Sequence, residues 1–351
     1  VLPKFNESRK RHLSEIGDKI RMDVKHFQKV ITDFEHSGCD YTADDVIAEF
    51  SSNNPENFLF PFMEGVIANL KTLGKIRTSE TYAATLCSFR RFREDKDVTL
   101  DDMDSDMMMA YEAYLKNNGV SPNSSSFYMR NLRAVYNRAV EKGLTSQRFP
   151  FKHVYTGVDK TVKRAVPLKV IKKIKEMDFS MNPSFDFARD MFLMSFYTRG
   201  MSFVDMAYLR KKDLQNGVLS YRRRKTGQQL FIKWEKCMQE IVDKYDTSQS
   251  NYLLPIIKPF GDIDERKQYI YAAHNINRCL KIIGKELGLS VSLTLYVARH
   301  AWASIAKSKN VPLSVISEGM GHDSEATTRI YLASLDTVAI DKANSMILKS
   351  L

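Results

Sequence analysis

The residues whose types suit chemistry on a phosphodiester lie in the last third of the chain. They form three short runs, which are Tyr296-Val297-Ala298-Arg299-His300, Gly319-Met320-Gly321-His322-Asp323-Ser324 and Thr327-Thr328-Arg329-Ile330-Tyr331. A phenol oxygen can hold a cut strand as a covalent ester, which stores the bond energy that resealing needs. Arginine offers paired donors to phosphate oxygens and keeps its proton. The runs therefore suit cutting and rejoining of a phosphodiester without an energy cofactor.

The overall charge favours the same kind of substrate. The 53 Lys and Arg residues outnumber the 42 Asp and Glu residues, which gives a formal net charge of +11. A basic excess of this size favours a polyanionic partner, and we expect double-stranded DNA. The four cysteines lie far apart without a C-x-x-C pair, and the sequence contains no convincing carboxylate or His/Cys cluster. We therefore expect no metal and no cofactor.

Length and composition limit the architecture. A chain of 351 residues with 43% hydrophobic and 27% charged residues is typical of a globular protein with two domains. No apolar run approaches the ~18 residues of a membrane-spanning helix, so we expect no membrane partner. The pattern predicts a mainly α fold, with a helical domain followed by a mixed α/β domain. We expect the second domain to be mostly helical around a small β-hairpin or sheet.

The helical domain is expected at residues 51–145, after a helical lead-in at 1–50. Apolar spacing predicts one helix from about Thr78 and another from about Ser124 to Lys142. Each of these helices has a basic face opposite its apolar face. A solvated surface would explain either face alone, but two such helices in one domain favour contacts to DNA phosphates. The candidate contacts are Arg90, Arg91, Arg130 and Arg133.

A basic linker is expected at 146–164, because the apolar periodicity stops there and positive charge dominates. The second domain then covers 165–335, with a short helix after Pro167 and a longer one at about 185–198. Asn216-Gly217 predicts a turn into a hairpin. Four cations stand at the far end of that hairpin and are candidates for phosphate binding, namely Arg222, Arg223, Arg224 and Lys225. Residues 336–351 form a tail with an apolar face.

The order and spacing of these motifs resemble the tyrosine recombinase, or phage integrase, family. That family combines an Arg-His pair, a later Gly-His and a nucleophilic tyrosine nine residues after the histidine, and Tyr331 follows His322 by nine residues here. The resemblance covers about residues 51–351 and is nearest to the branch of conjugative-transposon integrases and DNA invertases. It implies a helical core-binding domain ahead of a catalytic domain. It also implies that the lead-in at 1–50 is a remnant of an arm-binding domain.

The resemblance implies a role for each residue of the site. Tyr331 would be the nucleophile, Arg299 a phosphate clamp, and Lys225 the general acid for the departing 5′ oxygen. His322 would donate to a phosphate oxygen. His300 and Asp205 would support the site without touching the substrate.

Two positions depart from the family pattern. Tyr296 stands where the family has histidine, and a neutral phenol donates a hydrogen bond but is a poor proton shuttle near pH 7. Ser202 occupies the slot of the first arginine when its run is aligned on Asp205 and Leu209. Arg199 lies three residues earlier, and i and i+3 share a face on a helical turn. We therefore expect Arg199 to deliver the missing guanidinium.

The sequence thus predicts a site-specific DNA recombinase of a bacterial mobile element, an integrase or invertase, that acts through a 3′-phosphotyrosyl intermediate. The resemblance implies a homo-tetramer on two duplexes, with tail 336–351 docked on a neighbouring subunit and with DNA-bending accessory proteins as further partners. We expect the protein in the cytoplasm, associated with the nucleoid. A type IB topoisomerase and a non-catalytic DNA-binding relative are the alternatives.

Overall fold

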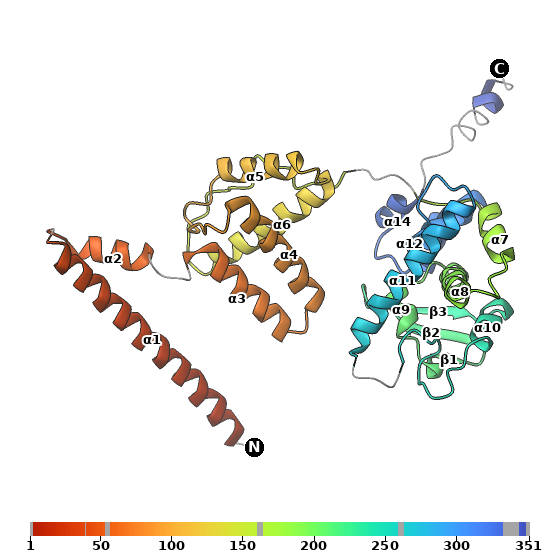
Figure 1. The fold of residues 1–351 in the computed structure, drawn as a ribbon, viewed down its shortest axis with the longest axis horizontal. Helices are drawn as coiled ribbons and strands as arrows, with labels where there is room; N and C mark the ends of the chain where they lie inside the picture. Colours follow the sequence, from red (N-terminus) through yellow and green to blue (C-terminus); the bar gives the residue numbers. More distant parts are fainter. Residues whose placement is uncertain are drawn as a thin grey trace. The chain divides into compact units, whose positions relative to one another are not determined.

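The computed structural model describes residues 3–38, 40–52, 57–159, 164–258, 263–332 and 344–348. The chain divides into two compact units, Val1–Lys160 (unit 1) and Thr161–Leu351 (unit 2). Both units are mostly helical and unit 2 holds one small sheet (Figure 1), which confirms the expected fold class. Within these ranges, no helix is long and apolar enough to cross a membrane.

Unit 1 begins with a helical hairpin. The helices are α1 (Pro3–Ser37) and α2 (Ala43–Ser52). The rings of Phe27 and Phe50 meet edge to face with their centroids 5.0 Å apart, and so join the two helices. The expected lead-in at 1–50 is therefore helical where it is described.

Four helices form a bundle in the rest of unit 1, namely α3 (Leu59–Thr72), α4 (Ile76–Arg93), α5 (Ser105–Asn117) and α6 (Pro122–Glu141). Their shared core includes the fully buried Phe89, Tyr111 and Tyr136. The Ser121 hydroxyl caps α6 by accepting from the Ser124 amide, and Pro122 occupies the first turn. The helices predicted from about Thr78 and Ser124 correspond to α4 and α6.

Residues 146–159 pack on this bundle, although the sequence predicts that a linker begins at 146. Phe151 and Val154 are buried in the same core, and the Tyr136 hydroxyl donates to the Ser146 carbonyl at 2.8 Å. The apolar period stops here because the segment is irregular, so the expected start of the linker is corrected. Residues 160–163 of that linker lie outside the described residues.

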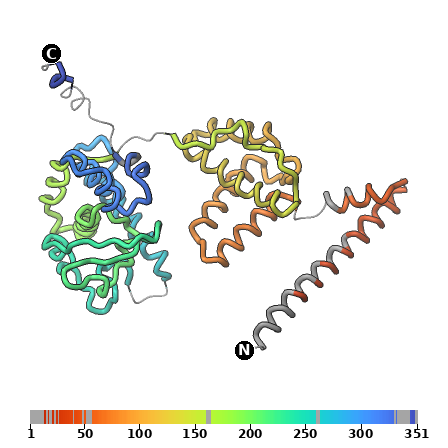
Figure 2. Tube along the Cα trace, turned by 180° about the vertical axis from the view of Figure 1, so that it is seen from behind, coloured from red at the N-terminus to blue at the C-terminus, as the bar shows by residue number. Residues whose placement is uncertain are grey.

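The described part of unit 2 contains eight labelled α-helices, a short helical segment at 344–348 and three strands. The helices are α7 (Leu168–Glu176), α8 (Pro183–Tyr197), α9 (Phe203–Ala207), α10 (Lys236–Asp243), α11 (Glu265–Glu286), α12 (Leu295–Ser308), α13 (Leu313–Gly319) and α14 (Glu325–Tyr331), and the strands are β1 (Leu214–Gln215), β2 (Val218–Arg222) and β3 (Gln229–Lys233). Helix α8 is the centre of the unit, because α7, α10, α11 and α12 all pack against it (Figure 1). The last helices, α12 to α14, pack on one another in the blue part of unit 2 (Figure 2).

The sheet is antiparallel with the order β1-β2-β3. Leu219 pairs with Ile232 and Tyr221 pairs with Leu230, and all four side chains are buried. The alternate residue Phe231 is 62% exposed. The sheet therefore buries one face, and the predicted hairpin is the β2–β3 pair.

A buried carboxylate fixes the end of α10 to α8. Asp190 on α8 is 3% exposed and accepts from Arg189, from the Lys244 ammonium at 2.9 Å and from the Tyr245 hydroxyl at 2.8 Å. The burial of Tyr245 and its bond to Asp190 raise the pKa of that phenol. This network is structural, because each of its charges already has a partner inside unit 2.

The expected tail at 336–351 is described only at 344–348, where it is helical. Met346, Ile347 and Leu348 are exposed there. Residues 333–343 and 349–351 lie outside the described residues, so docking of the tail on a neighbouring subunit stays a prediction.

Candidate active site

Arg299 lies at the centre of the site, on the buried side of α12. It is 5% exposed, and its guanidinium donates to the Gly200 carbonyl at 2.6 Å and to the Met320 carbonyl at 2.7 Å. These two carbonyls belong to the loop between α8 and α9 and to the end of α13. One arginine therefore ties three segments together, and this fixes the direction of its planar fork.

Gly200 makes this approach possible. Its φ is +75°, and a Cβ atom there would lie 2.6 Å from the Cα of Arg299. Only glycine adopts this backbone without strain and leaves room for the facing helix.

His322 lies against Arg299 just after α13. Its Nε2 is 2.8 Å from Nη2 of Arg299, and its Nδ1 is 2.8 Å from the hydroxyl of Thr328 on α14. Burial, followed by the charges of Arg299, Arg223 and Lys225, lowers the pKa of His322 to about 4. The imidazole is therefore neutral at pH 7.

Lys225 lies at the exposed tip of the β2–β3 hairpin, as predicted. The residue before it is held from two sides. The Arg224 amide donates to Oδ1 of Asp205 at 2.9 Å, and the Arg224 guanidinium lies 3.9 Å from the centre of the Tyr208 ring. The Ser202 hydroxyl in turn donates to Oδ2 of Asp205 at 2.6 Å. Asp205 and Ser202 thus anchor the turn that carries Lys225.

Arg223 is not part of an exposed basic surface, and this expectation is corrected. It is 6% exposed, and its guanidinium donates to the carbonyl of Gly321, next to His322. The strand pattern gives the reason. Leu219, Tyr221 and Arg223 are two residues apart, so all three point to the buried face of the sheet, whereas Arg222 and Arg224 point outward.

Arg199 lies in the loop between α8 and α9, so the helical-turn argument for its placement was wrong. Its φ is +60°, and Ser202 is the cap of the next helix. The Cδ of Arg199 nevertheless lies close to α13, because a Cβ at Gly319 would be 3.6 Å from it. Its charge acts on the same buried Tyr221 phenol as those of Arg299 and Arg223. The role of Arg199 stays a prediction.

Tyr296 and His300 lie one turn apart on α12. Their rings meet edge to face with centroids 4.6 Å apart, and Tyr296 is 50% exposed. His300 therefore supports the Tyr296 ring. The catalytic role of Tyr296 stays a prediction.

Tyr331 is the last residue of α14, and its side chain lies outside the described part of the structure. Thr328, one helical turn earlier, is fully buried and bonds His322. The helix that ends at the expected nucleophile is thus joined directly to the His322–Arg299 pair.

The remaining basic candidates lie on surfaces of their own units. Arg91, Arg130 and Arg133 are exposed on α4 and α6, and Arg222 is exposed on β2. Arg90 is held by an ion pair with Glu64 at 2.6 Å and lies over the Phe60 ring. Contacts of all these arginines with DNA stay predictions.

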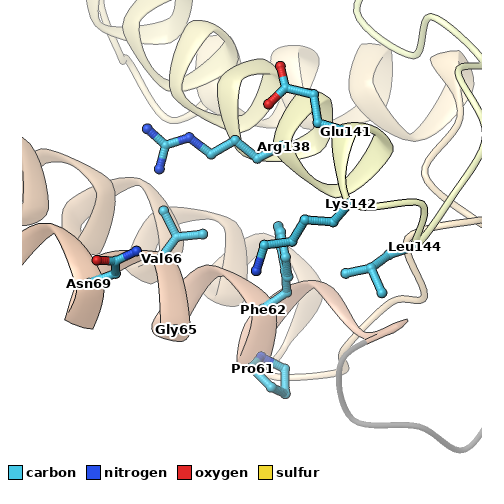
Figure 3. A pocket seen from close by; sticks show the side chains of 9 residues that line it. All are labelled: Pro61, Phe62, Gly65, Val66, Asn69, Arg138, Glu141, Lys142 and Leu144. Atoms are coloured by element: carbon cyan, nitrogen blue, oxygen red, sulfur yellow. The ribbon is translucent and has the colours of Figure 1, made fainter. Parts of the chain in front are cut away.

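A separate hollow of about 410 Å³ lies in unit 1 between α3 and α6 (Figure 3). Arg138 extends over it from α6 and Lys142 from the residue that follows this helix, and the Lys142 ammonium is 5.4 Å from the centre of the Phe62 ring. It contains none of the expected catalytic residues, all of which belong to unit 2. Across the described ranges, no group of three His, Cys, Asp or Glu side chains could hold a metal ion.

Thr328 was not identified from the sequence, and Arg223 was expected only as a surface contact to phosphate. The alternation along β2 could have placed Arg223 on the buried face beside Tyr221. Thr328 gives no such signal, because its contact depends on how α14 packs against the loop that carries His322.

Comparisons with known proteins match both units of the chain. Residues 58–154 match the phage integrase SAM-like domain, and residues 169–337 match the phage integrase family. No curated protein sequence matches the chain significantly.

Solved structures show the same fold at low sequence identity. A lambda integrase dimer bound to a COC' core site is 17% identical with a TM-score of 0.62, over 84% of this chain and 82% of that one. A lambda integrase tetramer bound to a Holliday junction is 16% identical with a TM-score of 0.60, over the same shares. The Tn1549 transposon integrase in complex with transposon right end DNA is 15% identical with a TM-score of 0.57, over 82% of this chain and 99% of that one. The two family matches span both units, and the second covers the cluster of Arg299, His322 and Lys225, so this chain belongs to the phage integrase family of tyrosine recombinases.

Proposed function

We propose that this chain is a site-specific recombinase that cuts one DNA strand per site through Tyr331, holds the 3′ phosphate as a phosphotyrosyl ester, and passes it to the 5′ hydroxyl of a partner duplex. The observation that carries this proposal is the buried cluster of Arg299, Arg223 and neutral His322, with Lys225 beside it. In strand exchange one ester replaces another at each step. No energy cofactor is then needed.

The cluster suits a phosphate that gains negative charge during attack. Arg299 is held by two backbone carbonyls, so its guanidinium is oriented before the substrate arrives. Preorganised donors of this kind stabilise developing charge without reorganisation. Because His322 beside it is neutral, the ring adds no second positive charge that would repel the Arg299 guanidinium.

Lys225 is proposed as the general acid for the departing 5′ oxygen. It is exposed at the hairpin tip, yet its charge is close enough to lower the pKa of His322. The Asp205 and Tyr208 contacts to Arg224 hold the turn, which limits where the ammonium can reach. Such placement within reach of the leaving oxygen is what acid catalysis requires.

The second guanidinium is proposed to be that of Arg223 in preference to Arg199. Arg223 contacts the carbonyl next to His322, and its charge helps to lower the pKa of that residue. The Cδ of Arg199 lies near Gly319 at the end of α13. The assignment of Tyr296 as a phosphate donor rests on its place one turn before Arg299.

The proposed substrate is double-stranded DNA, and the proposed assembly is a homo-tetramer on two duplexes. The solved relatives include a dimer and a tetramer bound to DNA, and the chain carries a net charge of +11. We propose a mobile-element integrase or invertase, aided by DNA-bending proteins and working on the bacterial nucleoid.

A nicked suicide substrate tests the proposed reaction. Cleavage releases a short oligonucleotide, so the covalent complex accumulates and survives denaturation. We expect this complex with the wild type and none with Tyr331→Phe. No adduct with the wild type, or an adduct with Tyr331→Phe, overturns the proposal.

The same assay decides the arginine assignment. We expect Arg223→Ala to lose cleavage, and Arg222→Ala, which removes at most one surface contact to a phosphate, to retain it at saturating protein. If Arg223→Ala cleaves normally and Arg199→Ala does not cleave, Arg199 is the residue that supplies the second guanidinium. A two-site recombination assay run beside supercoil relaxation then separates strand exchange from topoisomerase activity.

A further inference from the structure

The three side chains Thr328, His322 and Arg299 form a buried hydrogen-bonded chain across unit 2. Arg299 and His322 are 5% and 6% exposed, and Thr328 is fully buried. The two contacts are both 2.8 Å long. Solvent therefore cannot readily substitute for either partner, and the direction of each bond matters.

The direction follows from the donor properties of arginine. A guanidinium has only donors, so Nε2 of His322 must accept from Nη2 of Arg299. The single hydrogen of the neutral ring then lies on Nδ1 and is donated to the hydroxyl oxygen of Thr328. An imidazolium would turn Nε2 into a donor against Arg299.

The charges around the ring support the neutral form. Arg299 faces it from α12, and Arg223 and Lys225 face it from the hairpin turn. Thr328 on α14 is the uncharged neighbour whose hydroxyl oxygen accepts the hydrogen bond from Nδ1–H. Burial and these three cations lower the pKa of His322 to about 4.

The contact of Thr328 with His322 also depends on the position of α14, the helix that carries the expected nucleophile. Thr328 lies one turn before Tyr331 on α14, a helix of seven residues. A helix this short is not stable alone, so its position depends on its contacts with the rest of the unit. Besides Thr328, the described contacts include Leu332, which packs with Ala303, Ile316 and Met320.

We propose that Thr328 is a positioning residue which makes the hydrogen bond between His322 and Arg299 depend on the docking of α14. With α14 docked, the hydroxyl holds His322 as the Nδ1–H tautomer, and Nε2 then holds Arg299 toward the phosphate. With α14 displaced, the ring loses this constraint, and the Nε2–H tautomer opposes Arg299. This inference rests on the proposed strand-exchange function and adds a link between the nucleophile's helix and the clamp.

Thr328→Val and Thr328→Ser test the link. Valine keeps the shape but removes the hydroxyl, whereas serine keeps the hydroxyl. We expect single-turnover cleavage of the nicked substrate to fall by about 10- to 100-fold in Thr328→Val, the range for one lost buried hydrogen bond, and to recover in Thr328→Ser. Thr327→Val is the matched control, because it removes a hydroxyl from the same helix away from His322.

A spectroscopic measurement separates this role from simple packing. Nitrogen-15 NMR of the labelled full chain should show the Nδ1–H tautomer of His322 in the wild type and in Thr328→Ser, and a mixed or Nε2–H state in Thr328→Val. An unchanged tautomer in Thr328→Val, equal loss of cleavage in Thr328→Ser, or cleavage by Thr328→Val at the wild-type rate overturns the inference. The NMR result does not depend on cleavage, so a failure of the proposed reaction itself remains distinguishable.

Discussion

Replacing Gly200 with alanine should destabilise unit 2 and misplace Arg299. The new Cβ would lie 2.6 Å from the Cα and 2.8 Å from the Cγ of Arg299, and both backbones would have to move. The left-handed backbone costs a non-glycine residue about 1–2 kcal/mol. Overpacking of this kind adds about 1–3 kcal/mol. We therefore expect Gly200→Ala to lower the free energy of unfolding by about 2–5 kcal/mol.

Gly217→Ala is the matched control. Gly217 lies in the turn between β1 and β2 with a φ of +72°, and a Cβ there would meet nothing within 4 Å. Gly217→Ala should lower the free energy of unfolding only by the cost of the left-handed backbone, about 1–2 kcal/mol. Urea denaturation of the full chain measures both variants, and suicide-substrate cleavage well below the melting temperatures measures the effect on Arg299. Equal unfolding free energies for the two variants, or normal cleavage by Gly200→Ala, would refute the proposed crowding at Arg299.

Three further outcomes follow from the buried charges. His322 has a folded pKa of about 4 and an unfolded value near 6.5, so its contribution to stability is complete above pH 6.5 and is lost as the pH falls. Between pH 7 and pH 4 the wild type should lose about 3 kcal/mol more unfolding free energy than His322→Gln does, and equal losses would contradict burial of a neutral ring. Arg223→Lys should slow cleavage by about 100-fold, since a point charge cannot replace the fork that bonds the Gly321 carbonyl, whereas Arg222→Lys should retain activity in the same assay. Asp190→Asn should cost about 1–3 kcal/mol in urea denaturation, because it removes the buried charge that accepts from Arg189, Lys244 and Tyr245, while Asp186 still pairs with Arg189 and Lys244. Unchanged stability would show that the network is dispensable.

Helices and strands with strong periodicity could be predicted from the sequence. On α6 the apolar positions Leu132, Val135 and Tyr136 are fully buried, while Arg130 and Arg133 are exposed, as their spacing predicted. The Asn-Gly turn and the alternation after it likewise predicted the hairpin. These signals are local, so one stretch of sequence carries each of them.

Contacts between distant segments could not be predicted in this way. Apolar residues have no regular spacing in residues 146–159. Phe151 nevertheless lies in the core of unit 1, because an irregular segment can bury single side chains. The geometry at Arg199 depends on a left-handed backbone after α8, which a helical-turn argument does not anticipate. The Thr328 contact joins residues from two elements whose packing is set by the whole unit.

Ser202, in the slot of the family's first arginine, limits what can replace it. The Ser202 hydroxyl caps α9 and fixes Asp205, which in turn holds the loop that carries Lys225. A single Ser202→Arg change would therefore remove this support in the same step that introduced a cation.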